Sequence, residues 1–74
     1  MSFVEVDGEQ IQILERYVIY KFNNKKYRFL DLVYGSKRIV AVVEAIENPS
    51  IVLVFNSDKF AAKAVEVMED HGNV

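Results

Sequence analysis

The chain has 74 residues, of which 51% are hydrophobic and 27% are charged. A chain of this length supports one hydrophobic core and no second domain, and its apolar content excludes an intrinsically disordered protein. It contains no cysteine, which excludes disulfides and thiolate metal sites as supports for so small a core. We therefore expect a single domain spanning residues 1–74, stabilised by homodimerisation or by a bound partner.

The sequence also predicts a cytoplasmic protein. Its amino terminus has no basic stretch followed by an apolar one, so it does not have the pattern of a signal peptide. No apolar run approaches the roughly 18 residues that a membrane-spanning helix needs. The triplet Asn48-Pro49-Ser50 is no glycosylation site, because its proline blocks the reaction.

Charge is distributed unevenly along the chain. The net charge of −2 combines a basic middle third, from Arg16 to Arg38, with two acidic ends. In that third, seven bases accompany a single acid, Asp31. Such a distribution bears on the partners of a protein more than on its fold.

Two short polar dipeptides predict β-hairpins in the first half of the chain. Asp7-Gly8 separates residues 3–6 from residues 10–22, and Asn23-Asn24 separates residues 10–22 from residues 25–34. Both dipeptides favour the positive φ angles of a two-residue hairpin turn. The flanking segments are rich in Ile, Val, Tyr and Phe, which is typical of strands.

The second hairpin has a predicted register. A two-residue turn at Asn23-Asn24 places Tyr20 opposite Tyr27 and Arg16 opposite Asp31. A change of phase in the apolar alternation predicts a bulge or bend near Glu15-Arg16. The side of the hairpin better suited to the core carries Leu14, Val18, Tyr20, Phe22, Tyr27, Phe29 and Val33. The other side is mixed, and carries Tyr17, Ile19, Lys21, Lys26, Arg28, Leu30 and Leu32.

Residues 36–48 are predicted to form a helix, although their β-branched content favours a strand. The apolar residues recur at helical spacing, at Ile39, Val42, Val43 and Ile46. A strand would bury Glu44 beside Val42 and Ile46. Ser36 is a suitable N-cap, and Pro49 is a stop signal.

The last third predicts a buried strand and a second helix. Residues 51–55 form a continuous apolar run, which is typical of an interior strand covered on both faces. Asn56-Ser57-Asp58 then caps a helix to about Asp70, with Gly72 as its stop. The apolar side of this helix carries Phe60, Ala61, Ala64, Val67 and Met68.

These elements define an α+β fold of order β-β-β-α-β-α, a single small domain with a four-stranded mixed sheet and two helices on one face. The crossover between the third and fourth strands would be right-handed if these strands are parallel. The alternative is a five-stranded antiparallel meander with a C-terminal helix. The choice depends on whether residues 39–47 form a helix or a strand.

No motif of an enzyme is visible in the chain. It has no glycine-rich phosphate loop, no metal-ligand spacing and no nucleophile motif. The single histidine, His71, is expected to be a solvated residue at a helix terminus. We therefore expect no catalytic residues, no cofactor and no metal site. A reaction that uses the carboxylates of Glu15 and Asp31 is the remaining enzymatic alternative.

The segment from Tyr20 to Arg28 interleaves basic and aromatic residues around the predicted Asn23-Asn24 turn. Lysine and arginine neutralise phosphates, aromatic rings stack on unpaired bases, and a two-stranded ribbon fits the major groove. Alternatively, the lysines protect a sheet edge and the aromatic rings face the core. The basic residues are therefore better candidates than the aromatic ones.

Lys37 and Arg38 are a second candidate anion site. At the first turn of the predicted helix, the dipole disfavours bases, so helix stability does not explain them. A helix N-terminus that follows Gly35-Ser36 and carries two bases is suited to a phosphate.

The sequence thus predicts a small DNA- or RNA-binding accessory or regulatory protein. Its candidate phosphate contacts are Lys21, Lys25, Lys26, Arg28, Lys37 and Arg38. The predicted dimer interface is the apolar part of the mixed hairpin side, namely Tyr17, Ile19, Leu30 and Leu32, because helices on the other side leave it exposed. The alternative is a protein-interaction module or inhibitor whose acidic helices dock on a basic partner through Glu44, Glu47, Glu66, Glu69 and Asp70. The isoelectric point near 5.3 favours this alternative.

Overall fold

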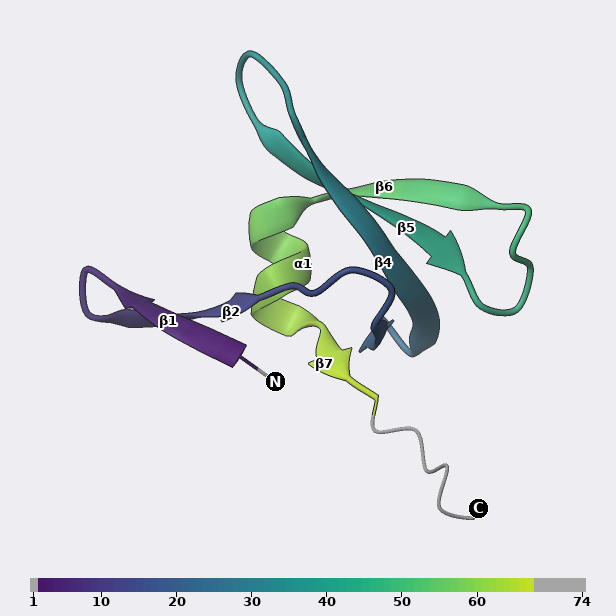
Figure 1. Ribbon diagram of the computed structural model, residues 1–74, viewed down its shortest axis with the longest axis horizontal. Coiled ribbons are helices and arrows are strands. Elements are labelled where there is room, and N and C mark those ends of the chain that lie inside the picture. The colour runs from purple at the N-terminus through teal and green to yellow at the C-terminus, as the bar shows by residue number, and fades with distance from the viewer. Residues whose placement is uncertain (1, 68–74) are drawn as a thin grey trace.

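The structure is a computed structural model that describes residues 2–67 (Figure 1). In this range the elements are β1 (Ser2–Val6), β2 (Glu9–Ile13), β3 (Ile19–Phe22), β4 (Lys25–Tyr34), β5 (Ile39–Ala45), β6 (Val52–Asn56), α1 (Ser57–Lys63) and β7 (Val65–Glu66). Strands β1 and β2 form a sheet of their own. The other strands form a five-stranded sheet in the order β6-β5-β4-β3-β7, and every pair in it is antiparallel. The predicted four-stranded mixed sheet with two helices on one face is therefore wrong.

Both predicted two-residue turns are confirmed. Asp7 and Gly8 have φ angles of 52° and 84°, and Asn23 and Asn24 have φ angles of 53° and 65°. These are the left-handed conformations that a tight hairpin with the natural strand twist requires. The register of the β3–β4 hairpin is also as predicted, since Tyr20 pairs with Tyr27.

The chain bends before β3, as the phase change near Glu15-Arg16 predicts. Tyr17 has a positive φ of 69° there, and its N–H donates to the Phe29 carbonyl at 2.7 Å. Arg16 then reaches Asp31, with Nη2 and Oδ2 3.1 Å apart. The predicted meeting of these two charges is therefore confirmed.

The predicted helix over residues 36–48 is wrong. Residues 39–45 form strand β5, which pairs with β4 on one side and β6 on the other. A strand was expected to be unfavourable here because it would bury the Glu44 carboxylate beside Val42 and Ile46. In the structure, Glu44 lies on the face of the sheet opposite the core, and Arg28 of β4 is beside it, with Nε and Oε1 3.7 Å apart. The β-branched composition, supported by two ladders of hydrogen bonds, thus prevails over the helical spacing.

The interior position predicted for residues 51–55 is also wrong, because β6 is an edge strand of the sheet. The helix that follows is shorter than predicted. Asn56 caps it as expected, and its Oδ1 accepts from the Asp58 N–H at 3.0 Å, but the backbone becomes extended at Ala64. The end predicted for this helix near Asp70 lies outside the described residues, as do Met68, His71 and Gly72.

Helix α1 covers one face of the five-stranded sheet and supplies the centre of the core. Phe60 is fully buried, and its ring lies against those of Tyr20, Phe22 and Phe55, with centroids 4.9 to 6.0 Å away. The buried core as a whole consists of Tyr20, Phe22, Tyr27, Phe29, Ala41, Val43, Phe60 and Ala64. The opposite face of the sheet has no layer over it among residues 2–67.

The β1–β2 hairpin lies beside α1 and extends away from the large sheet (Figure 1). Its attachment is Gln12, which is buried. The Gln12 side-chain amide donates to the carbonyls of Ala61 and Ala64, at 3.0 and 2.9 Å. These carbonyls belong to the last turn of α1 and to its C-cap residue, Ala64, where no further helical N–H is available to them.

A bulge in β4 changes which side chains reach the core. The pairing with β5 shifts between Phe29 and Asp31, so Leu30 is an extra residue on β4. Leu32 therefore packs against the core, whereas Val33, predicted for the core, is 49% exposed. Within residues 2–67, no helix has the length and apolar character needed to cross a membrane.

Candidate nucleic-acid interface

Three lysines gather at the end of the β3–β4 hairpin. Lys21 is directly opposite Lys26, and Lys25 is opposite Phe22. All three lysines are exposed. The tight Asn23-Asn24 turn thus places three positive charges on one short ribbon.

The aromatic residues of the same segment face the core. Tyr20, Phe22 and Tyr27 are at most 6% exposed, so they are not available to stack on bases. The interpretation of these rings as core residues is confirmed. A nucleic acid at this hairpin would therefore meet the charges of the lysines and not the faces of these rings.

The pairing of Lys21 with Lys26 is unfavourable for the isolated hairpin. Like charges directly opposite each other destabilise a sheet, by an amount comparable to the roughly 0.2–1 kcal/mol of a favourable pair. In the part of the chain that the structure describes, Lys21, Lys25 and Lys26 have no carboxylate within ion-pair distance. A bound polyanion would remove this repulsion.

Arg28 is less available than the lysines. It lies two residues from Lys26 on the same face of β4, but it is the partner of Glu44. The two side chains are 37% and 30% exposed. Its charge is therefore partly neutralised within the chain.

Lys37 and Arg38 do not lie at a helix N-terminus. They belong to the loop between β4 and β5, which the Gly35 N–H closes by donating to the Arg38 carbonyl at 2.8 Å. This loop and the Asn23-Asn24 turn are at opposite ends of β4 (Figure 1), about 30 Å apart at roughly 3.3 Å per residue. Asp58 lines the same hollow as the two bases, so an anion there would meet a carboxylate.

The acidic residues predicted to dock on a basic protein partner do not lie on helices where the structure describes them. Glu44 is on β5, Glu47 follows that strand, and Glu66 is on β7. Glu69 and Asp70 lie outside the described residues. Acidic helices as a docking surface are therefore not formed by the residues that the structure describes.

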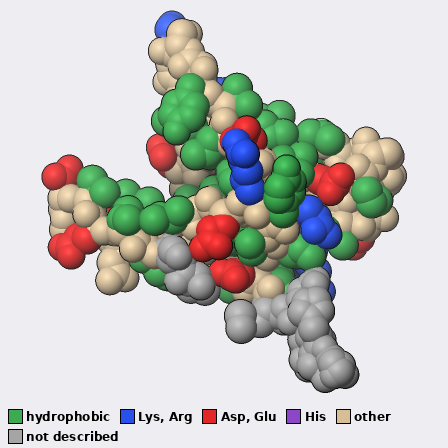
Figure 2. All heavy atoms as spheres, viewed as in Figure 1, with side chains coloured by type: hydrophobic (Ala, Val, Ile, Leu, Met, Phe, Trp, Pro, Cys, Tyr) green, Lys and Arg blue, Asp and Glu red, His purple; other side chains and the backbone are tan. Residues whose placement is uncertain are grey.

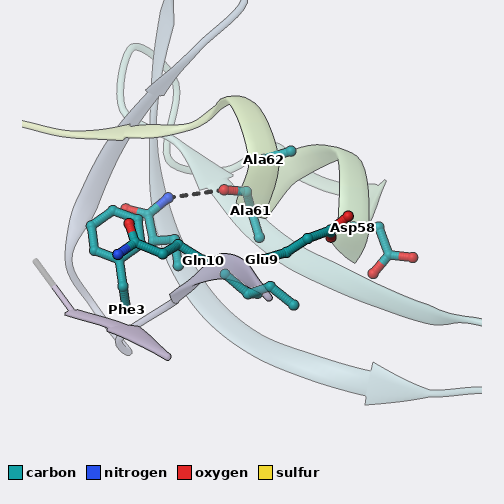
Figure 3. Close-up of a pocket in the computed structure, with 8 residues that line it drawn as sticks. Phe3, Glu9, Gln10, Asp58, Ala61 and Ala62 are labelled. Atoms are coloured by element: carbon teal, nitrogen blue, oxygen red, sulfur yellow. Dashed lines mark hydrogen bonds between the residues drawn. The ribbon is translucent and has the colours of Figure 1, made fainter. Parts of the chain in front are cut away.

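The structure instead shows a groove between the β1–β2 hairpin and α1 (Figure 3). It has a volume of about 500 Å³ and is lined by Phe3, Glu9, Gln10, Ile11, Gln12, Asp58, Ala61 and Ala62. Glu9 and Asp58 come from its two different walls. Sequence analysis missed this groove because it depends on the contact between Gln12 and α1, about fifty residues apart in the chain.

Hydrophobic side chains line much of the same hairpin. Figure 2 shows them gathered along β1 and β2, with acidic side chains at the far end. Phe3, Val4 and Val6 are each 43% to 49% exposed. The groove is thus continuous with an exposed surface that is both apolar and acidic.

Two side chains among residues 2–67 have shifted pKa values, and both shifts have structural causes. The Leu32 N–H, which donates to Asp31 Oδ1 at 2.8 Å, and the guanidinium of Arg16 lower the pKa of Asp31. Burial raises the pKa of Tyr20. Both shifts move the group away from the neutral range, and neither prepares a residue for proton transfer near neutral pH.

Within residues 2–67, no cluster of three or more His, Cys, Asp or Glu side chains is suited to hold a metal ion. No protein-family model, curated protein or solved structure matches the chain. The chemistry of the chain's own residues therefore carries the functional assignment.

Proposed function

We propose that the protein is a small accessory or regulatory protein that binds nucleic acid through the end of the β3–β4 hairpin. Lys21, Lys25 and Lys26 would contact backbone phosphates there. The proposal depends mainly on one observation, the pairing of Lys21 with Lys26 directly across the ladder. The chain tolerates this repulsion although its net charge is −2.

Binding of this kind is electrostatic and independent of base sequence. The buried rings of Tyr20, Phe22 and Tyr27 leave phosphate contacts as the source of affinity at this hairpin. Lys37 and Arg38 would contribute only with a nucleic acid long enough to reach along β4. The proposal includes a cytoplasmic location, where nucleic acid is present and a chain without cysteine needs no oxidising compartment.

A salt titration of binding to duplex DNA, single-stranded DNA and RNA tests the proposal. Each neutralised phosphate contributes about −0.9 to the slope of log K against log salt for duplex DNA. Three lysines per chain therefore predict a slope of about −2.7 per bound chain. The variant Lys25→Glu/Lys26→Glu should bind at least tenfold more weakly and show a slope reduced by about two.

The matched control is Lys37→Glu/Arg38→Glu, which makes the same change in net charge at the other end of β4. It should retain most of the affinity for a short duplex. Equal losses in the two variants would show that overall charge governs binding and would contradict a site at the hairpin end. A salt-independent affinity of the unmodified protein would contradict phosphate contacts altogether.

We propose a protein-interaction role as the second candidate function, because the groove beside α1 favours it. Its apolar lining and the carboxylates of Glu9 and Asp58 suit an extended segment with hydrophobic and basic side chains. A synthetic peptide of alternating Leu and Lys would probe it by isothermal titration. Glu9→Gln/Asp58→Asn should weaken that binding severalfold, while Glu5→Gln/Asp7→Asn, a pair on the same hairpin outside the groove lining, should not. Equal binding by both variants would contradict the role of the groove.

A further inference from the structure

The uncovered face of the five-stranded sheet is more apolar than a water-exposed face should be. Tyr20, Phe29, Val43 and Phe55 point toward α1, so their neighbours in each strand point away from it. On β6 these neighbours are Val52 and Val54, which are 54% and 57% exposed. On β4 and β5 they include Val33, Val40 and Val42.

An antiparallel sheet with one face in water normally alternates apolar and polar side chains. Strands β5 and β6 do not follow this rule. Their sequences, IVAVVEA and VLVFN, are apolar on both sides. This composition is typical of strands that are covered on both faces, whereas α1 covers only one.

The two charges at the centre of this face are arranged in a definite order. The strand register places one residue from each of four strands in a single row, which reads Ile19, Arg28, Glu44 and Val52. The row is apolar, positive, negative and apolar. If a second copy of the row is placed over the first in reverse order, each apolar residue lies over an apolar residue, and each charge lies over the opposite charge.

We propose that this face packs on the same face of a second copy of the chain. The twofold axis would run along the strands, between β4 and β5. Ile19 would then lie over Val52 of the second copy, and Arg28 over Glu44 of the second copy. The two sheets would form a sandwich, with strands roughly aligned and faces about 10 Å apart.

The surroundings of the row are compatible with this contact. Lys21 and Lys26 lie one step beyond it, toward the Asn23-Asn24 turn, and remain at the rim. Asp31, on the other side, is already neutralised by Arg16. No unpaired charge of the described residues would therefore be enclosed at the centre of the interface.

The size of the face predicts a weak dimer. Four strands about 4.8 Å apart and some six residues long project roughly 380 Å². This area reaches the size of patches that mark interaction sites, but it is below the roughly 800 Å² per partner of a standard interface. We therefore expect a dissociation constant in the micromolar range.

The single charge reversals Arg28→Glu and Glu44→Arg test the twofold arrangement, with sedimentation analysis over a concentration series. Each reversal makes the row carry two like charges, so each variant alone should dissociate at least tenfold more readily. An equimolar mixture should dimerise again, because the row of one variant is then complementary to that of the other. The double variant Arg28→Glu/Glu44→Arg should dimerise by itself.

This design separates the interface from the fold. The ion pair within the chain is lost in both single variants and in their mixture, so a merely destabilised chain would not be rescued by mixing. Val6→Lys, which adds a charge at an exposed valine of β1, should leave dimerisation unchanged.

Two results would overturn the proposal. One is a monomeric protein at all concentrations up to the millimolar range. The other is a dimer that persists unchanged in both single variants, which would point to pairing along the open edge of β6 instead. In that case Val54→Pro, which removes a backbone N–H from this edge, should abolish the dimer.

Discussion

At the scale of single residues, Tyr20 connects the core to the bend that precedes β3. Its ring is 1% exposed, and its hydroxyl oxygen accepts from the Glu15 N–H at 2.9 Å. Replacement by phenylalanine keeps the ring and leaves this N–H without its acceptor. We expect Tyr20→Phe to lower the free energy of unfolding by about 0.5–1.5 kcal/mol near neutral pH.

The same residue predicts a dependence of stability on alkaline pH. Burial raises the pKa of Tyr20 above its ordinary value of 10.0, so the unfolded chain releases this proton at lower pH than the folded chain. The contribution to stability is complete below that ordinary value and is lost as the pH rises through the folded value. Urea unfolding of the unmodified protein and of Tyr20→Phe should therefore give free energies of unfolding whose difference shrinks as the pH rises above 10.0, the ordinary pKa of tyrosine. A constant difference at every pH would contradict the role of the buried hydroxyl.

At the scale of elements, the sequence predicts those whose signal is local. The Asn23-Asn24 dipeptide determines the turn, the turn determines the register, and the register brings Arg16 to Asp31. Each step involves neighbours in the chain or across one ladder. The capping of α1 by Asn56 belongs to the same class.

The elements that sequence analysis missed depend on distant partners. The helical spacing in residues 39–45 is real, but β4 and β6 offer this segment two ladders of hydrogen bonds. A helix would leave β6 without a neighbour and β4 paired with β3 alone. Glu44 tolerates the strand because Arg28 stands opposite it. The extra residue Leu30 places Leu32 on the core side of the sheet and Val33 on the other side. No local sequence pattern predicts this bulge.

The candidate site divides in the same way. The lysines at the hairpin end follow from the turn, so they are predictable from sequence. The supposed anion site at Lys37 and Arg38 depended on a helix that does not form. Of the four predicted dimer residues, Ile19 falls in the row at the centre of the uncovered face, and Leu32 is on the core side.

At the scale of the whole molecule, the proposed dimer and the proposed nucleic-acid site would reinforce each other. A twofold axis along the strands keeps the two Asn23-Asn24 turns at the same end of the assembly. Lys21, Lys25 and Lys26 of both copies would then form one basic surface with twice the charge. The Lys37-Arg38 loops would form a separate pair at the opposite end.

This arrangement predicts that dimerisation controls the salt dependence of binding. A dimer that uses both hairpin ends neutralises about six phosphates, so its slope against log salt should be about −5.4 for duplex DNA. Glu44→Arg, which should disrupt the proposed dimer and replaces a negative charge by a positive one, should bind more weakly, with a slope near −2.7. The measurement is a titration of each protein on the same duplex above and below the concentration at which the unmodified protein dimerises. Only the twofold arrangement makes a more basic chain the poorer ligand for DNA. Tighter binding by Glu44→Arg than by the unmodified protein at both concentrations would therefore contradict a role of the dimer in binding.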